Sequence, residues 1–157
     1  MKKRLSLRIS AFSLLCVLLI IVLLFLQCGT TFWTYGKDKA VSLQGYIWFP
    51  ADHSALNKQL NADLGLTGNF NPSSILLFPV LTLLTGAVGV VLGLLFADRL
   101  ISAILPILCG ASAIVGYIIK PALQLGINWQ LHLAAAVLLV LAGVVHLIKL
   151  LKATDDE

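Results

Sequence analysis

The stretch "TLLTGAVGVVLGLLFADRL" (residues 82–100) is an almost unbroken apolar run that ends in a charged pair, and it carries glycine at positions 86, 89 and 93. Its apolar part is close to the roughly 20 helical residues needed to cross a hydrocarbon core of about 30 Å. Glycine is a poor helix former in water, so three glycines in one such helix call for an explanation. The stretch predicts a transmembrane helix with an unusual packing face.

The rest of the chain has the same character. Of its 157 residues, 59% are hydrophobic and only 11% are charged, which is far from the balance of a water-soluble domain. The apolar segments that are long enough to span a membrane lie at 9–28, 74–97, 100–120 and 129–150. They show no strict alternation, which favours helices over a closed barrel. We therefore expect an all-α membrane protein, with four transmembrane helices in an antiparallel bundle and a single domain over residues 1–157.

The distribution of basic residues predicts the orientation. With the N-terminus inside, seven of the 11 Lys and Arg residues fall on the cytoplasmic side and four on the outer side. The inner ones are Lys2, Lys3, Arg4, Arg8, Arg99, Lys149 and Lys152, and the outer ones are Lys37, Lys39, Lys58 and Lys120. This predicts cytoplasmic termini, an outer loop over residues 29–73, and a location in the plasma or bacterial inner membrane. No basic stripe with interleaved aromatic residues follows the N-terminal cluster, so no nucleic-acid partner is expected.

The first apolar segment has two interpretations. The basic start followed by "AFSLLCVLLIIVLLFL" (11–26) is typical of a secretory signal peptide as well as of a membrane anchor. The following "LQCGTTFW" (26–33) has no small-residue cleavage site. The sequence favours an uncleaved signal anchor, and cleavage, which would leave three spans, is the alternative.

The outer loop of about 45 residues combines a strand pattern with a helix pattern. "VSLQGYIWF" (41–49) alternates apolar and more polar residues, which predicts a short strand or hairpin, and Pro50 ends it. "DHSALNKQLNADLG" (52–65) predicts a short helix with a leucine stripe. The stripe could lie on the loop's own strand, on the outer lipid interface or on a partner protein. The candidates for contact with a partner are Trp48, Leu56, Leu60 and Leu64.

Two of the three glycines, Gly89 and Gly93, belong to a four-residue repeat with Thr85 and Ala97, and Gly86 widens the same face at its outer end. Small residues at this spacing form one shallow groove along a helix, and in lipid such a groove favours close contact with a neighbouring helix. The predicted helix-packing residues are Thr85, Gly86, Gly89, Gly93 and Ala97. The groove can receive a helix of the same chain or a helix of a second copy, and the sequence does not separate these two possibilities.

Residues suited to catalysis or metal binding are scarce in the spans. The middles of the four segments hold no charged residue, whereas proton relays and ion-coupled transporters place such residues there. His132 and His146 lie near span ends and are interpreted as interfacial. Cys16, Cys28 and Cys109 are too far apart to form a C-x-x-C motif. We therefore predict no catalytic, cofactor or metal site, and the chain is not expected to be an enzyme.

The layout of the chain resembles the claudin-type tetraspan proteins. The resemblance rests on four spans, a long first outer loop starting "GTTFWTY" (29–35) with a later "GYIWF" (45–49), and "SSILLFPVLTLL" (73–84) entering the second span. Proteins of that type build junctions or serve as accessory subunits of channels. The paired loop cysteines of that group are absent here, so no residue role is carried over.

These observations lead to one expected function and one alternative. The expected function is that of a multi-pass membrane protein that acts without catalysis as an assembly or accessory component of a membrane complex. Its partners would be the lipid bilayer and another membrane protein or a second copy of itself. The alternative is a small transporter or channel subunit whose pore forms only on oligomerisation.

Overall fold

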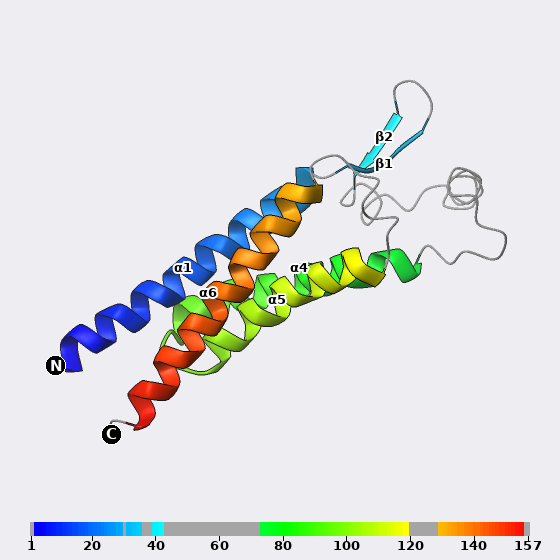
Figure 1. The fold of residues 1–157 in the computed structure, drawn as a ribbon. Coiled ribbons are helices and arrows are strands. Elements are labelled where there is room, and N and C mark those ends of the chain that lie inside the picture. The colour runs from blue at the N-terminus through cyan, green and yellow to red at the C-terminus, as the bar shows by residue number, and fades with distance from the viewer. Residues whose placement is uncertain (1, 30, 36–38, 43–72, 120–128, 156–157) are drawn as a thin grey trace.

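A computed structural model describes residues 2–29, 31–35, 39–42, 73–119 and 129–155 of the chain. These residues form four helices and two short strands (Figure 1). The elements are α1 (Lys2–Gly29), β1 (Thr31–Tyr35), β2 (Lys39–Ser42), α4 (Ser73–Leu95), α5 (Ile101–Ile119) and α6 (Trp129–Asp155).

All four described helices are long and apolar enough to cross a membrane, which confirms the four predicted apolar helices. The predicted segments and the helices differ mainly at their ends. Helix α1 begins well before residue 9, and α6 continues to Asp155 instead of ending at residue 150. Helices α4 and α5 each contain an internal proline, Pro79 and Pro106, which membrane helices tolerate where neighbours satisfy the freed backbone groups.

Hydrogen bonds between helices define how α1 and α4 run relative to each other. The Ser13 hydroxyl donates to the Gly93 carbonyl at 2.8 Å, and the Gln27 amide nitrogen donates to the Pro79 carbonyl at 3.0 Å. The part of α1 around Ser13 therefore lies beside the end of α4, and the end of α1 lies beside the first turns of α4. These two helices run in opposite directions.

Helices α5 and α6 are related in the same way. Ser102 near the start of α5 lies within hydrogen-bond distance of His146 in the second half of α6, and Tyr117 near the end of α5 meets His132 near the start of α6. Helix α5 contacts α4 and α6 extensively, and α1 contacts α4 and α6, so each helix has two main neighbours. The N-terminal end of α1 and the C-terminal end of α6 lie at the same end of the helices (Figure 1).

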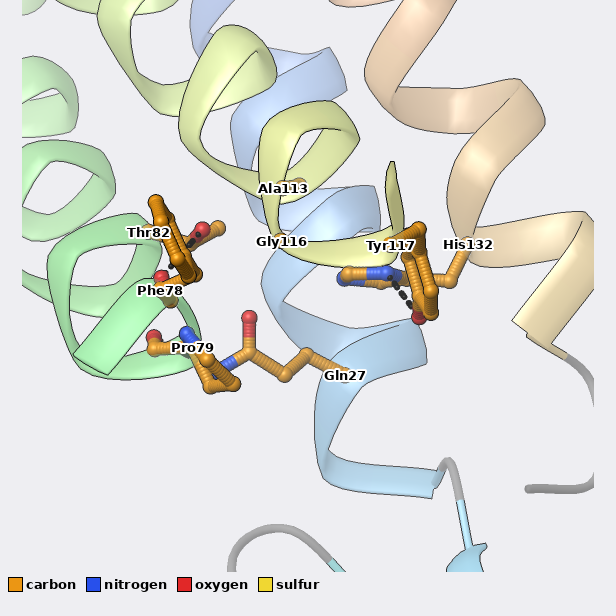
Figure 2. A pocket seen from close by; sticks show the side chains of 8 residues that line it. All are labelled: Gln27, Phe78, Pro79, Thr82, Ala113, Gly116, Tyr117 and His132. Carbon is orange, nitrogen blue, oxygen red and sulfur yellow. Dashed lines mark hydrogen bonds between the residues drawn. The ribbon is translucent and has the colours of Figure 1, made fainter. Parts of the chain in front are cut away.

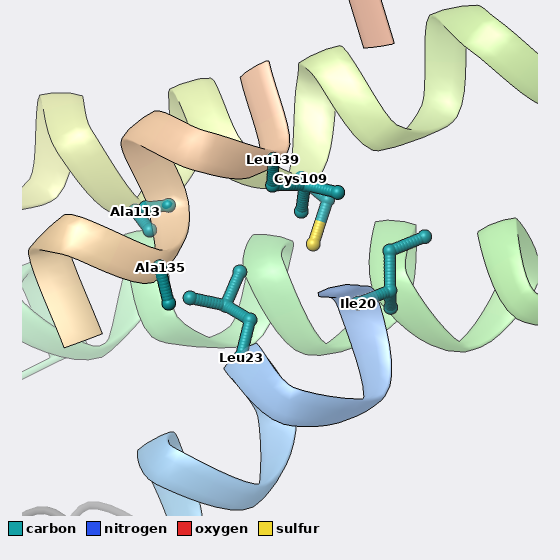
Figure 3. Close-up of a cluster of buried hydrophobic side chains, with 7 residues drawn as sticks. Ile20, Leu23, Cys109, Ala113, Ala135 and Leu139 are labelled. Carbon is teal, nitrogen blue, oxygen red and sulfur yellow. The ribbon is translucent and has the colours of Figure 1, made fainter. Parts of the chain in front are cut away.

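The apolar core lies where α1, α5 and α6 converge (Figure 3). Its buried members are Ile20, Leu23, Cys109, Ala113, Ala135, Ala136 and Leu139. Three of the seven are alanines, which allow the helix backbones to approach closely. Large apolar side chains are also exposed on all four helices, including Phe25 and Ile118 at 77% and 70%. Such outward faces suit a hydrocarbon surrounding rather than water.

The strands β1 and β2 pair in an antiparallel manner, with Tyr35 opposite Lys39 and an irregularity near Trp33. The strand predicted over 41–49 overlaps β2 only at Val41 and Ser42. Residues 43–49 and the helix predicted over 52–65 lie outside the described residues, so these expectations stay predictions.

Candidate functional site

A few polar side chains are buried among the apolar side chains of the four helices. They are Ser13, Gln27, Thr82, Ser102, His132 and His146, each at most 3% exposed. A polar group placed in a hydrocarbon surrounding without a hydrogen bond costs several kcal/mol, roughly 2–7 depending on the reference state. These residues are therefore the first candidates for a site. They fall into two groups, one near Gln27 and His132 and one near His146.

The first group surrounds a small cavity between all four helices, which we call the Gln27–His132 cavity (Figure 2). It is lined by Gln27 of α1, by Phe78, Pro79 and Thr82 of α4, by Ala113, Gly116 and Tyr117 of α5, and by His132 of α6. Its volume is about 10 Å³, close to the minimum needed to hold one water molecule.

Helix α4 contributes backbone carbonyls and a hydroxyl to this region. Pro79 lacks an N–H, and its carbonyl accepts the Gln27 amide proton at 3.0 Å. The Thr82 hydroxyl lies 2.8 Å from the Ser112 hydroxyl of α5 and 2.9 Å from the Phe78 carbonyl. The Cys109 thiol donates to the Thr82 carbonyl at 3.4 Å. These bonds fix α4 against α1 and α5 at one end of the bundle.

A tyrosine and a histidine form the other wall of the cavity. The Tyr117 hydroxyl lies 2.7 Å from His132 Nδ1, which is a short hydrogen bond. The two rings meet edge to face at 71°, with 5.5 Å between their centroids, and Trp129 packs on Tyr117 with centroids 5.8 Å apart. The aromatic contacts hold the His132 ring in one orientation.

Two polar atoms of this cavity have no hydrogen-bond partner. They are Gln27 Oε1 and His132 Nε2, both fully buried. Figure 2 shows the Gln27 amide between Pro79 and the pair formed by Tyr117 and His132. An amide oxygen can only accept a hydrogen bond, whereas the imidazole nitrogen donates or accepts according to its tautomer. The cavity thus offers hydrogen bonds to a small neutral group.

The second group lies toward the other end of the bundle. His146 Nε2 is 2.9 Å from the Ser102 hydroxyl, which also contacts the carbonyls of Ala97 and Arg99. His146 Nδ1 is buried without a partner. Close by in sequence, the Lys149 ammonium lies 4.6 Å from the centre of the Phe12 ring. This group joins α6 to the start of α5 and to α1.

The three glycines among the predicted helix-packing residues lie inside the bundle. A methyl group added at Gly86 would lie 3.1 Å from the Leu24 side chain and 3.2 Å from Cys109 Sγ, and at Gly89 it would lie 3.0 Å from Ile20 Cδ1. At Gly93 it would lie 2.8 Å from Val17 Cγ2. All three thus face α1, and Gly86 and Gly89 also face α5, within the same chain.

The other predicted residues have different surroundings. Thr85 is partly exposed, and its hydroxyl donates to the Leu81 carbonyl of its own helix at 2.6 Å. Ala97 lies just beyond α4, partly buried, and its carbonyl accepts a bond from Ser102. The candidates for contact with a partner, Trp48, Leu56, Leu60 and Leu64, lie outside the described residues. Within the described ranges, no three His, Cys, Asp or Glu residues are grouped so that they could hold a metal ion.

Sequence reasoning missed the roles of Gln27, His132 and His146. The two histidines, interpreted from the sequence as interfacial, are 3% and 0% exposed, so their side chains lie among neighbouring helices of the same chain. Neither has an acidic partner on its own helix, and their partners Tyr117 and Ser102 lie on α5. A signal was present, because two antiparallel helices joined by a short connection place the end of one beside the start of the next.

Comparison of this chain with protein family models, with curated proteins and with solved structures finds no match. The site is therefore interpreted from its own geometry.

Proposed function

We propose that this protein is a multi-pass membrane protein that acts without catalysis as an assembly or accessory component of a membrane complex. The observation that carries the proposal is the contrast between its interior and its surface. Among the described residues, the interior is closely packed around an apolar core, and the polar groups buried there are mostly bonded to one another. The surface presents large apolar side chains on every helix.

This contrast supports a role in binding another membrane protein rather than in converting a substrate. Among the described residues, the cavity near Gln27 has a volume of about 10 Å³, whereas pockets for drug-sized ligands have volumes of about 300–1,000 Å³. The exposed apolar faces are available for lipid and for the helices of another membrane protein. The alternative, a transporter or channel subunit, would need a pore formed between several copies.

The proposal includes an antiparallel four-span bundle as a single domain over residues 1–157, with both termini cytoplasmic and the loop 29–73 outside, in a plasma or bacterial inner membrane. It is supported by the excess of Lys and Arg on the assigned inner side. In the proposed complex, Trp48 and the leucine stripe of the loop would contact the partner.

Purification in a mild detergent, followed by native mass analysis, tests the function. A defined complex with a second membrane protein is the expected result. A ring of several copies of this chain alone would favour the pore-forming alternative. A monomer without any partner, obtained also after cross-linking in the membrane before solubilisation, would contradict both.

Cysteine labelling tests the orientation. In a variant without the three native cysteines, Lys58→Cys should react with a membrane-impermeant maleimide in intact cells, whereas Asp155→Cys should react only after the cells are opened. The reverse pattern would overturn the proposed orientation.

A further inference from the structure

The Gln27–His132 cavity has the features of a binding site and not only of a packing defect. Gln27 is 1% exposed and His132 is 3% exposed, both residues line the cavity, and each has one unpartnered polar atom. In native proteins nearly all buried polar atoms have a protein or water partner. Two unpartnered atoms that line one cavity therefore indicate an occupant that bonds to both of them.

The fixed partners of the two residues define which atoms are free. Gln27 donates its amide proton to the Pro79 carbonyl, so the other terminal atom of its side chain is the oxygen, which can only accept. His132 uses Nδ1 for the Tyr117 hydroxyl, which leaves Nε2 free. When Tyr117 donates to Nδ1, the neutral ring carries its proton on Nε2 and presents a donor.

We infer that Gln27 Oε1 and His132 Nε2 together bind one neutral hydroxyl oxygen, which accepts a hydrogen bond from Nε2–H and donates one to Oε1. The cavity volume of about 10 Å³ fits a single water molecule. The hydroxyl of a small amphiphile from the bilayer offers the same chemistry. Water also suits the other tautomer, because it can donate to Nε2 and to Oε1 at once.

The cavity does not favour a charged occupant. Its lining includes no Asp, Glu, Lys or Arg. An ion in this cavity would have no opposite charge among the lining residues, and burying an unpaired charge is far more costly than burying a hydroxyl.

Solid-state NMR of histidine-labelled protein in lipid bilayers tests the inference. The signal of His132 is identified as the one that is lost in His132→Phe. In the wild-type protein, magnetisation from water protons should reach His132 Nε2, and the transfer should be lost in Gln27→Met, which removes the acceptor at similar side-chain volume. Thr85→Val is the matched control, because Thr85 bonds to its own helix and does not line the cavity, so the transfer should be unchanged.

Native mass analysis of the same bilayer-reconstituted protein distinguishes the two sources of the hydroxyl. A water signal at Nε2 with no retained extra mass identifies water, and a retained amphiphile whose mass is lost in Gln27→Met identifies an amphiphile. Both results support the inference. If wild-type protein shows neither a water signal at Nε2 nor a retained amphiphile, the inference is overturned, and this result needs no variant that folds.

A double-mutant cycle provides an independent measurement. Because the occupant bridges the two residues, the losses of thermal stability in Gln27→Met and His132→Phe should differ from additivity by about 2 °C or more. Additive losses would contradict a shared occupant. None of these measurements depends on the proposed accessory role, which would stand or fall with the purification experiment.

Discussion

The glycines at the contact of α4 with α1 and those at the contact of α5 with α6 differ in the atoms that they face. On α4, an added methyl group at Gly86, Gly89 or Gly93 would meet side chains only, and the closest atom would be 3.1, 3.0 and 2.8 Å away, respectively. Where α5 meets α6, the added group would also meet backbone. At Gly110 it would lie 2.7 Å from the Ala136 carbonyl oxygen, and at Gly143 it would lie 3.3 Å from the Ala103 carbonyl oxygen.

A regular spacing of glycines in the sequence therefore does not by itself show where two helix backbones approach most closely. The α4 glycines stand out in the sequence because they recur on one face, yet the atoms opposite them are largely ends of side chains that can turn away. A backbone atom can retreat only if a whole helix shifts, and close-packed interiors resist such shifts. The α5–α6 contact is therefore the more rigid of the two interfaces, and methyl insertions there should cost the most.

The largest effect is expected for Gly110→Ala. The new methyl group would overlap both the Ala136 carbonyl oxygen and Val140 Cγ2, each at 2.7 Å. Overfilling of this kind should reduce the free energy of unfolding by about 2 to 3 kcal/mol. Reversible unfolding in detergent, followed by circular dichroism, measures the loss.

Two further variants sharpen this prediction. Ile118→Ala, at a residue of the same helix that is 70% exposed, should change the stability little. Adding Val140→Ala to Gly110→Ala should not restore stability, because the Ala136 carbonyl remains in place. Full recovery in the double variant would show that side chains alone limit this contact.

An intermediate effect is expected for Gly143→Ala. The closest atom is Ile107 Cγ1 at 2.7 Å, while the nearest backbone atoms are both 3.3 Å away. The free energy of unfolding should fall by about 1 to 2 kcal/mol. Adding Ile107→Val to Gly143→Ala should restore little of this loss, because Cγ1 is retained as a methyl group. The same unfolding measurement applies, and a loss larger than that of Gly110→Ala would reverse the ranking.

The four apolar helices could be predicted from the sequence because segment length and hydrophobicity decide membrane insertion without any tertiary information. The contacts of Gly93 with Val17 and of Gln27 with Pro79 could not be predicted in this way. Each depends on which faces of α1 and α4 meet, and α1 is apolar on all sides over most of its length. The pairing of Tyr117 with His132 depends likewise on the rotation of two helices about their axes.

A smaller loss, of about 1 kcal/mol, is expected for Gly93→Ala. Its methyl group would lie 2.8 Å from Val17 Cγ2, and the only other atom within 4 Å is the Ser13 hydroxyl oxygen at 3.7 Å. Because a single side chain causes the clash, Val17→Ala in the same chain should restore most of the stability. Thermal unfolding of the single and double variants checks this. If the double variant loses as much stability as the two single variants together, the prediction is contradicted.

The smallest effect is expected for Gly89→Ala, and two opposing terms explain why. The new methyl group would lie 3.0 Å from Ile20 Cδ1, the terminal atom of a flexible side chain, and 3.4 Å from Leu105 Cβ. A shift of a few tenths of an ångström at Ile20 relieves the first contact, while alanine stabilises a helix by about 0.5–1 kcal/mol relative to glycine. The variant should therefore stay within about 0.5 kcal/mol of the wild-type protein. Val91→Leu, at a 54% exposed position of the same helix, gives the reference for a change without packing consequences. If Gly89→Ala loses as much stability as Gly110→Ala, the contact between α4 and α1 is as rigid as the contact between α5 and α6, and the distinction between side-chain and backbone neighbours does not govern this bundle.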